Sequence, residues 1–125
     1  MSIFCRYGEA LKFIKDYDPK HLGLVLDYYH CWWDNELICA VHESKEFLGM
    51  VHISDWGKSG HDRLDRVIIG DGIIPINTLT QVIHETSYNG VFEIEIMNQK
   101  YTNSKNLAET LARDLDLLKD MFPVC

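Results

Sequence analysis

Apolar positions along the chain alternate between helical spacing and short continuous runs. A first helix is predicted to begin near Glu9, and its inner face is formed by Ala10, Leu11, Phe13 and Ile14. After the turn at residues 18–20, residues 22–26 form a continuous apolar run that ends at Asp27. A continuous run is typical of a parallel strand that is buried on both faces, so we expect a strand here.

The same alternation continues to the end of the chain. Asp34 can cap a helix at about residues 35–45, and residues 47–53 predict a second buried strand. A long polar loop at residues 55–72 follows it. Pro75 suits the first position of a third helix, whose apolar face carries Leu79, Val82 and Ile83.

A third strand is predicted at residues 91–97, after a turn at residues 88–90. A terminal helix then presents Leu107, Leu111, Leu115 and Leu118 at spacings of three and four. The acidic residues between Glu109 and Asp120 are expected to form the solvated face of that helix. The resulting α-β-α-β-α-β-α order predicts an α/β fold with a parallel sheet and right-handed crossovers.

Each predicted strand carries a polar residue at or near its carboxyl end, namely Asp27, His52 and Glu95. These ends meet at one edge of a parallel sheet, where sites form in barrels and open sheets. Glu93 and Glu95 point the same way because strand residues alternate faces. Alone, the His is more often a core residue and the Asp a helix cap. Together the three suit a divalent metal ion such as manganese, magnesium, cobalt or zinc.

Composition narrows the classes of function. The chain has 125 residues, 46% of them hydrophobic, and a net charge of −7. This length predicts one domain, and the acidic balance disfavours nucleic-acid binding. No apolar run is long enough to span a membrane and no signal-peptide pattern begins the chain, so a cytoplasmic protein without a membrane partner is expected.

Four segments carry a family resemblance. They are residues 23–34 (GLVLDYYHCWWD), 51–56 (VHISDW), 66–72 (RVIIGDG) and 88–95 (YNGVFEIE). In this order they resemble the sixth strand, the seventh strand, its following loop and the eighth strand of sugar phosphate isomerase/epimerase proteins. These proteins belong to the xylose isomerase-like TIM barrel superfamily. The resemblance extends over about residues 9–120, and Ser87 stands where the family often has Gly.

The resemblance implies the fold and the site. Residues 1–125 would form a single partial domain, the C-terminal portion of a TIM (β/α)8 barrel with about three parallel strands and covering helices. Asp27, His52 and Glu95 match three of the family's four metal ligands, whereas its fourth ligand, a Glu on the fifth strand, has no counterpart here. His30 and Arg66 match substrate-binding residues. Trp32, Trp33 and Trp56 could wall a sugar pocket or pack beneath loops, and the sequence favours neither.

The implied function is a metal-dependent isomerase or epimerase of a sugar or sugar phosphate. The reaction would pass a proton through a cis-enediolate, with Glu95 as metal ligand and as one of two acid/base carboxylates. A C-terminal fragment lacking the second carboxylate is expected to show little activity alone, and to self-associate or require a complementing N-terminal barrel part. The alternative is a truncated remnant without turnover. Phosphodiester cleavage, known in a related group, is disfavoured because it needs more metal ligands and a basic groove.

Overall fold

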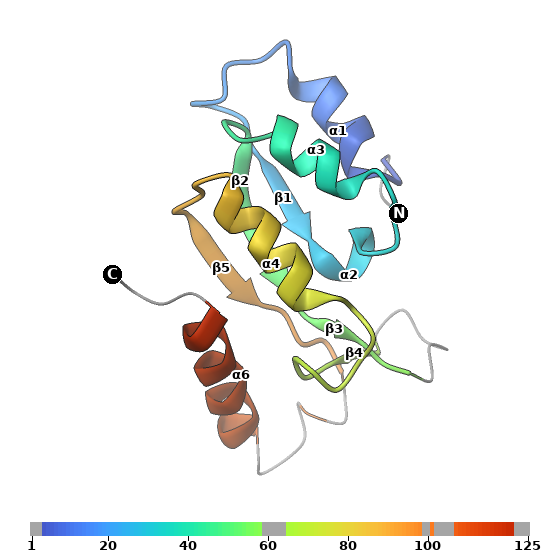
Figure 1. Ribbon diagram of the computed structural model, residues 1–125, viewed down its shortest axis with the longest axis vertical. Helices are drawn as coiled ribbons and strands as arrows, with labels where there is room; N and C mark the ends of the chain where they lie inside the picture. The colour runs from blue at the N-terminus through green and yellow to red at the C-terminus, as the bar shows by residue number, and fades with distance from the viewer. Residues whose placement is uncertain (1–3, 59–64, 99–100, 102–106, 122–125) are drawn as a thin grey trace.

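Three short strands lie side by side and run parallel in the computed structural model, which describes residues 4–58, 65–98, 101 and 107–121. The sheet order is β1-β2-β5, and each crossover contains helices, as Figure 1 shows. The helices and strands, in chain order, are α1 (Tyr7–Ile14), β1 (Leu24–Asp27), α2 (Tyr28–Cys31), α3 (Leu37–Glu43), β2 (Leu48–Ile53), β3 (Asp55–Trp56), β4 (Arg66–Val67), α4 (Ile76–Glu85), β5 (Val91–Ile94) and α6 (Leu107–Met121). The predicted α/β fold with three parallel strands is confirmed.

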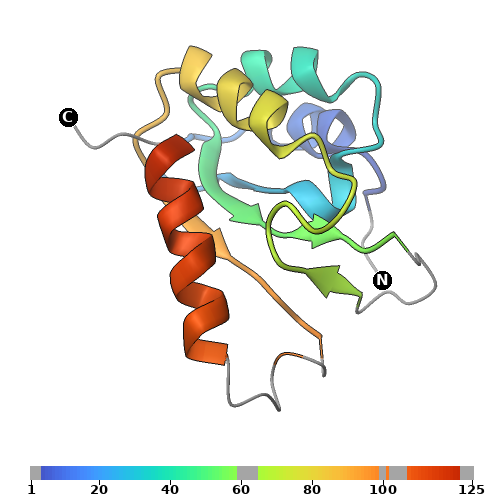
Figure 2. The same cartoon turned by 60° about the horizontal axis from the view of Figure 1, so that its bottom comes forward.

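Helices cover one face of this sheet. α1, α3 and α4 lie in a layer above it and α6 lies beside β5 (Figure 2). The strand side chains beneath the layer are buried, with Leu26, Val51 and Ile53 each at most 1% exposed. This packing joins side chains from α3, α4 and the sheet into one hydrophobic core. None of the helices in the described residues is long and apolar enough to cross a membrane.

The opposite face of the sheet is open in the described part of the chain. The register places two rows of side chains across it. The first row is apolar and consists of Val25, Met50 and Val91. The second row is polar and consists of Asp27, His52 and Glu93. Val25 is 50% exposed and Val91 57%, so the expectation that these strands are buried on both faces is wrong for this face.

Helix α1 begins two residues before the predicted start near Glu9. The expected inner residues Leu11 and Ile14 are buried, but Phe13 is 56% exposed. Residues three or four apart share a helix face, and Phe13 stands in neither relation to the two buried residues. Its ring instead packs near that of Tyr17, with centroids 6.0 Å apart. The placement of Phe13 on the inner face was therefore wrong.

Helix α4 begins after Pro75, which occupies the cap position instead of the first helical position. Its predicted apolar face is confirmed, since Leu79, Val82 and Ile83 are buried. Two residues after the helix, Ser87 adopts a φ of 61°. This left-handed conformation favours glycine because a side chain is strained there. It gives a physical reason for the glycine that the resemblance expects at this turn.

The segment from Asp55 to Gly72, predicted as a polar loop, contains the antiparallel pair β3 and β4. The Asp55 side chain organises it from a fully buried position, 1% exposed. Its carboxylate accepts four backbone N–H groups, those of Trp56 at 2.8 Å, Gly70 at 3.1 Å, Gly72 at 3.0 Å and Ile74 at 2.9 Å. One buried side chain thus ties the start of the segment to its end.

Helix α6 buries Leu118, whereas Leu115 is 51% exposed, so the predicted leucine face is only partly correct. Asp114 shares the face of Leu118 and is 0% exposed, so the expected solvated acidic face is wrong at this residue. Neither of its carboxylate oxygens has a hydrogen-bond partner among the described residues. Burial raises the pKa of Asp114 from 3.8 to about 6, an effect partly offset by the nearby backbone of Ile69 and by the neighbouring Arg113.

We predict that Asp55→Ala lowers the free energy of unfolding by about 3 kcal/mol or more, because four backbone N–H donors lose one buried carboxylate acceptor together. Urea unfolding of the purified chain measures this loss. The matched control is Asp16→Ala, which removes an exposed carboxylate and is expected to change stability little. Equal stabilities of the two variants would contradict the organising role of Asp55.

We also predict that Asp114→Asn raises the free energy of unfolding by an amount that depends on pH. The folded chain keeps the Asp114 proton up to pH about 6, whereas the unfolded chain loses it near 3.8, so wild-type stability falls as pH rises through this window. The amide of the variant does not titrate. The free energy of unfolding of the variant therefore exceeds that of the wild type by near zero at pH 4 and by on the order of 2 kcal/mol above pH 6. Unfolding at pH 4 and pH 7.5 tests this, with exposed Asp120→Asn as control. An advantage of equal size at both pH values would refute it.

Candidate metal centre

Asp27 stands where β1 passes directly into α2. Its Oδ1 accepts the backbone N–H of Tyr29 at 2.9 Å, which caps the short helix. Its Oδ2 lies 2.9 Å from Nη2 of Arg66. Helix capping, the ordinary reason for an Asp at a strand end, therefore explains only one of the two carboxylate oxygens.

His52 lies beside Asp27 in the register of the sheet, near the end of β2. Its side chain is 22% exposed on the open face. Nδ1 lies 3.1 Å from Oε2 of Glu95, and Nε2 lies 3.5 Å from Oε2 of Glu93 and 3.1 Å from Sδ of Met50. The imidazole is therefore placed between two carboxylates.

Glu95 lies one residue beyond the end of β5. Its backbone N–H donates to the carbonyl oxygen of Ile53 at 3.0 Å, which extends the pairing of β5 with β2. Strand alternation predicts that Glu93 and Glu95 share a face, and both contact His52. The Glu95 side chain is 26% exposed, so it remains accessible from the open face.

The three side chains predicted as ligands converge. One potential ligand atom from each of Asp27, His52 and Glu95 lies within 4.8 Å of the other two. This confirms the predicted convergence at one edge of the sheet. An imidazole nitrogen and two carboxylate oxygens form a mixed donor set of the kind that manganese, magnesium, cobalt and zinc accept. The donor chemistry and the partial exposure both fit a divalent ion.

Arg66 reaches the same cluster from β4. Its guanidinium makes a two-pronged contact with Asp27, Nη1 to Oδ1 at 3.2 Å and Nη2 to Oδ2 at 2.9 Å. Nη2 also lies 3.4 Å from Oε2 of Glu95. Only 2% of the side chain is exposed, so this is a buried ion pair rather than a loop arginine at the rim of a cleft.

His30 lies on the solvent side of this contact. Its Nε2 atom is 3.3 Å from Nη2 of Arg66 and 3.8 Å from Oδ2 of Asp27. The side chain is 66% exposed. The structure therefore brings all five residues that the sequence analysis singled out into one contiguous group, with His30 the most accessible member.

Two neighbours of Arg66 were missed by the sequence analysis. Ser54 is fully buried and its Oγ accepts Nη1 of Arg66 at 2.9 Å. The ring of Tyr29 lies under the guanidinium, 4.4 Å from its carbon to the ring centroid. Ser54 follows His52 by two residues, so strand alternation could have indicated it. No sequence signal marked Tyr29.

Packing explains two of the three tryptophans. Trp56 stacks on the buried ring of Tyr29 with centroids 4.5 Å apart, and Trp32 packs against the core. Trp33 is 50% exposed. Packing beneath the loops therefore accounts for Trp32 and Trp56.

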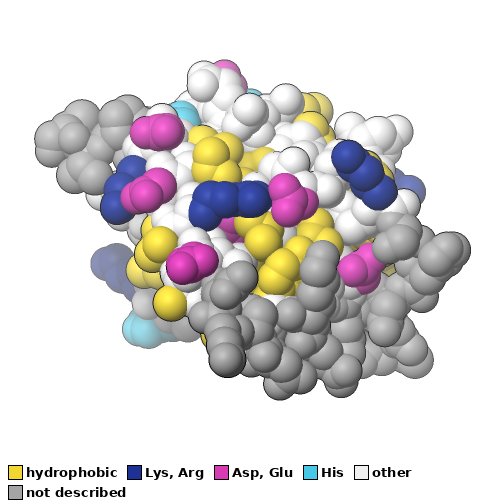
Figure 3. Space-filling model, turned by 90° about the horizontal axis from the view of Figure 1, so that it is seen from below, with side chains coloured by type: hydrophobic (Ala, Val, Ile, Leu, Met, Phe, Trp, Pro, Cys, Tyr) yellow, Lys and Arg dark blue, Asp and Glu magenta, His cyan; other side chains and the backbone are white. Residues whose placement is uncertain are grey.

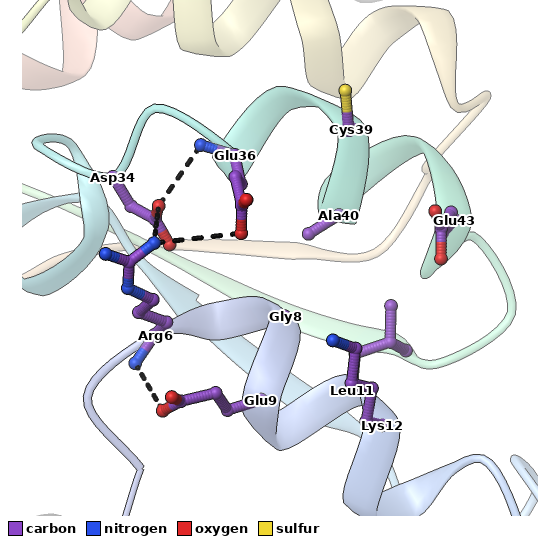
Figure 4. A pocket seen from close by; sticks show the side chains of 10 residues that line it. All are labelled: Arg6, Gly8, Glu9, Leu11, Lys12, Asp34, Glu36, Cys39, Ala40 and Glu43. Carbon is purple, nitrogen blue, oxygen red and sulfur yellow. Dashed lines mark hydrogen bonds and ion pairs between the residues drawn. The ribbon is translucent and has the colours of Figure 1, made fainter.

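The end of the molecule toward which the strands run carries charges of both signs. Seen from the end of the molecule where the strands finish, acidic and basic side chains alternate with apolar groups over the described surface (Figure 3). A groove of about 510 Å³ lies elsewhere, between α1 and α3 (Figure 4). There the Arg6 guanidinium lies 3.4 Å from Asp34 and 3.7 Å from Glu36. This groove contains none of the residues assigned to the metal site.

Comparison with known sequences gives a family match over nearly the whole chain. A family model described as xylose isomerase-like TIM barrel matches residues 1–121. A curated relative, 3-dehydro-D-guloside 4-epimerase of Escherichia coli (strain K12), is 29% identical over 84 residues. That alignment covers 66% of this chain and 29% of the relative.

Solved structures share the fold at low identity. A protein from Sinorhizobium meliloti 1021 has a TM-score of 0.80 at 24% identity, over 94% of this chain and 43% of its own. The IOLI protein with a bound zinc atom has a TM-score of 0.81 at 20% identity, over 96% of this chain and 46% of its own. D-psicose 3-epimerase with D-tagatose from Clostridium cellulolyticum H10 has a TM-score of 0.76 at 17% identity, over 97% of this chain and 45% of its own. The chain thus corresponds to part of a TIM barrel and spans less than half the length of these proteins.

Proposed function

Because the chain belongs to the xylose isomerase-like TIM barrel family, we propose that Asp27, His52 and Glu95 bind one divalent metal ion in a sugar isomerase or epimerase site. The observation that carries this proposal is the convergence of their ligand atoms within 4.8 Å. The zinc atom in the IOLI protein makes zinc one candidate beside manganese, magnesium and cobalt.

The proposed chemistry is proton transfer beside a sugar carbonyl, through a cis-enediolate. A bound divalent ion would supply Lewis-acid polarisation of that carbonyl. Glu95 would be one of the two carboxylates that remove and return the proton, since its carboxylate is accessible from the open face. The exposed His30 would hold a substrate oxygen, and Arg66 would stabilise negative charge that develops on the substrate.

A two-carboxylate proton transfer needs a second acid/base group across the substrate. Glu93, which also contacts His52, lies beside Glu95 near the end of β5 and not across from it. The remaining metal ligand and the second carboxylate would therefore come from another polypeptide segment. We propose that residues 1–125 act as one partial barrel domain, equivalent to strands six to eight, whose open face pairs with a complementing barrel part or a second copy.

The open apolar row also favours a second candidate function. Val25 is 50% exposed and Val91 57%, as expected for a sheet face that another polypeptide segment would cover. In the absence of such a partner, the domain would bind metal without catalytic turnover. Metal binding is common to both candidates, and turnover separates them.

We predict that the purified chain binds Mn²⁺ or Zn²⁺ at one saturable site. Glu95→Gln replaces a charged ligand oxygen by an amide, and His52→Asn removes the imidazole nitrogen. Each substitution is expected to weaken metal binding by about 10-fold or more. Isothermal titration calorimetry measures the affinity. The control Glu46→Gln removes an exposed carboxylate that lies away from the cluster. Unchanged affinity in both ligand variants would refute the assignment.

We further predict that the 125-residue chain alone does not epimerise D-tagatose at a measurable rate, even with saturating Mn²⁺. Absence of the second acid/base group alone costs about 10²–10⁴-fold, and the incomplete ligand set adds to it. Chromatography of the sugar after prolonged incubation tests this, with a full-length family enzyme as positive control. Turnover on the order of 1–10³ per second would show that the described residues already contain a complete site.

A further inference from the structure

One cation already occupies the carboxylates of the proposed metal site, and it belongs to the protein. Nη2 of Arg66 lies 2.9 Å from Oδ2 of Asp27 and 3.4 Å from Oε2 of Glu95. These two residues contribute both oxygens of the three-residue cluster whose ligand atoms lie within 4.8 Å. The guanidinium therefore bridges the same pair of carboxylates that a metal ion would bridge.

Hydrogen bonds already occupy one of the two oxygens of Asp27. Oδ1 of Asp27 already accepts two donors, the backbone N–H of Tyr29 at 2.9 Å and Nη1 of Arg66 at 3.2 Å. Oδ2 is thus the oxygen of Asp27 that remains for a metal ion, and Nη2 lies against it. Oε2 of Glu95 likewise lies 3.1 Å from Nδ1 of His52 and within reach of Nη2. A metal ion held by Oδ2 of Asp27 and Oε2 of Glu95 would share both oxygens with the guanidinium.

The guanidinium is held firmly in this position. Ser54 accepts Nη1 at 2.9 Å, the Tyr29 ring lies beneath the guanidinium carbon at 4.4 Å, and only 2% of the Arg66 side chain is exposed. Around a guanidinium this deeply buried, repulsion from a neighbouring cation is weakly screened. The exposed neighbour on the other side is His30, 3.3 Å from Nη2.

We propose that Arg66 is the counter-cation of the metal-free site and competes with the divalent ion for Asp27 and Glu95. Metal binding would then loosen the contact of the guanidinium with Glu95 and leave the guanidinium on the side that faces His30. This inference rests on the proposed metal site. It assigns Arg66 a second role, which sets metal affinity and couples metal loading to the position of a substrate-binding group. Metal binding then precedes recognition of the sugar, because the guanidinium is released only after the carboxylates gain another cation.

Calorimetry with Mn²⁺ at low ionic strength tests the competition. Arg66→Gln removes the charge and keeps a side chain of hydrogen-bonding length, and it is expected to bind Mn²⁺ about tenfold more tightly than wild type. Arg66→Lys retains the positive charge, and its increase in Mn²⁺ affinity over wild type is expected to be much smaller than that of Arg66→Gln. Arg113→Gln is the matched control, because it removes one positive charge from an exposed arginine paired with Asp71 and leaves the cluster intact. Equal or weaker binding by folded Arg66→Gln would overturn the proposal.

Ser54→Ala provides an independent variant in case Arg66→Gln fails to fold, as judged by circular dichroism. It removes one hydrogen bond that fixes the guanidinium and touches no proposed ligand, so Mn²⁺ affinity is expected to rise by roughly 2–5-fold. Unchanged affinity would overturn the competition. Absence of Mn²⁺ binding in the wild type would instead refute the metal site itself, so the two failures are distinguishable.

Discussion

The parallel register of β1, β2 and β5 is the constraint on which the rest of the structure depends. Pairing Asp27 with His52, and His52 with Glu93, places three polar side chains in one row across the open face. The same register places Val25, Met50 and Val91 in the row below. Since side chains alternate along each strand, the residues between these rows face the helices and form the core. Core and site are therefore two consequences of one set of backbone hydrogen bonds.

The polar row creates a concentration of negative charge that the fold must balance. Asp27 and Glu95 both contact Arg66, the one Lys or Arg side chain that does so among the residues described. Burial of an arginine is costly, and here the cost is offset by a two-pronged carboxylate contact, a hydroxyl acceptor and an aromatic ring. Removal of one partner would leave the others as uncompensated buried charge. The site residues are thus mutually dependent for stability as well as for any metal chemistry.

The departures from sequence-based expectation share a cause. Asp55 looked like the start of a polar loop, yet four backbone N–H groups converge on its carboxylate and fold that loop into a paired segment. Asp114 looked like a solvated helix residue, yet α6 turns it toward the core beside Leu118. Phe13 looked like a core residue and is exposed. In each case the local pattern is compatible with either face, and the decision depends on which element packs there.

The sequence by itself determined the three parallel strands with their intervening helices and the meeting of Asp27, His52 and Glu95 at one edge, but not the short elements α2, β3 and β4. The strands, helices and shared edge follow from apolar periodicity and from the rule that parallel strands share a carboxyl edge, both of which are local or topological. The ion pairs of Arg66, its contacts with Tyr29 and Ser54, and the burial of Asp114 were decided only by tertiary structure. These contacts join residues brought together by crossovers and loop folding, and side-chain partners over such separations are set by three-dimensional packing rather than by any spacing along the chain.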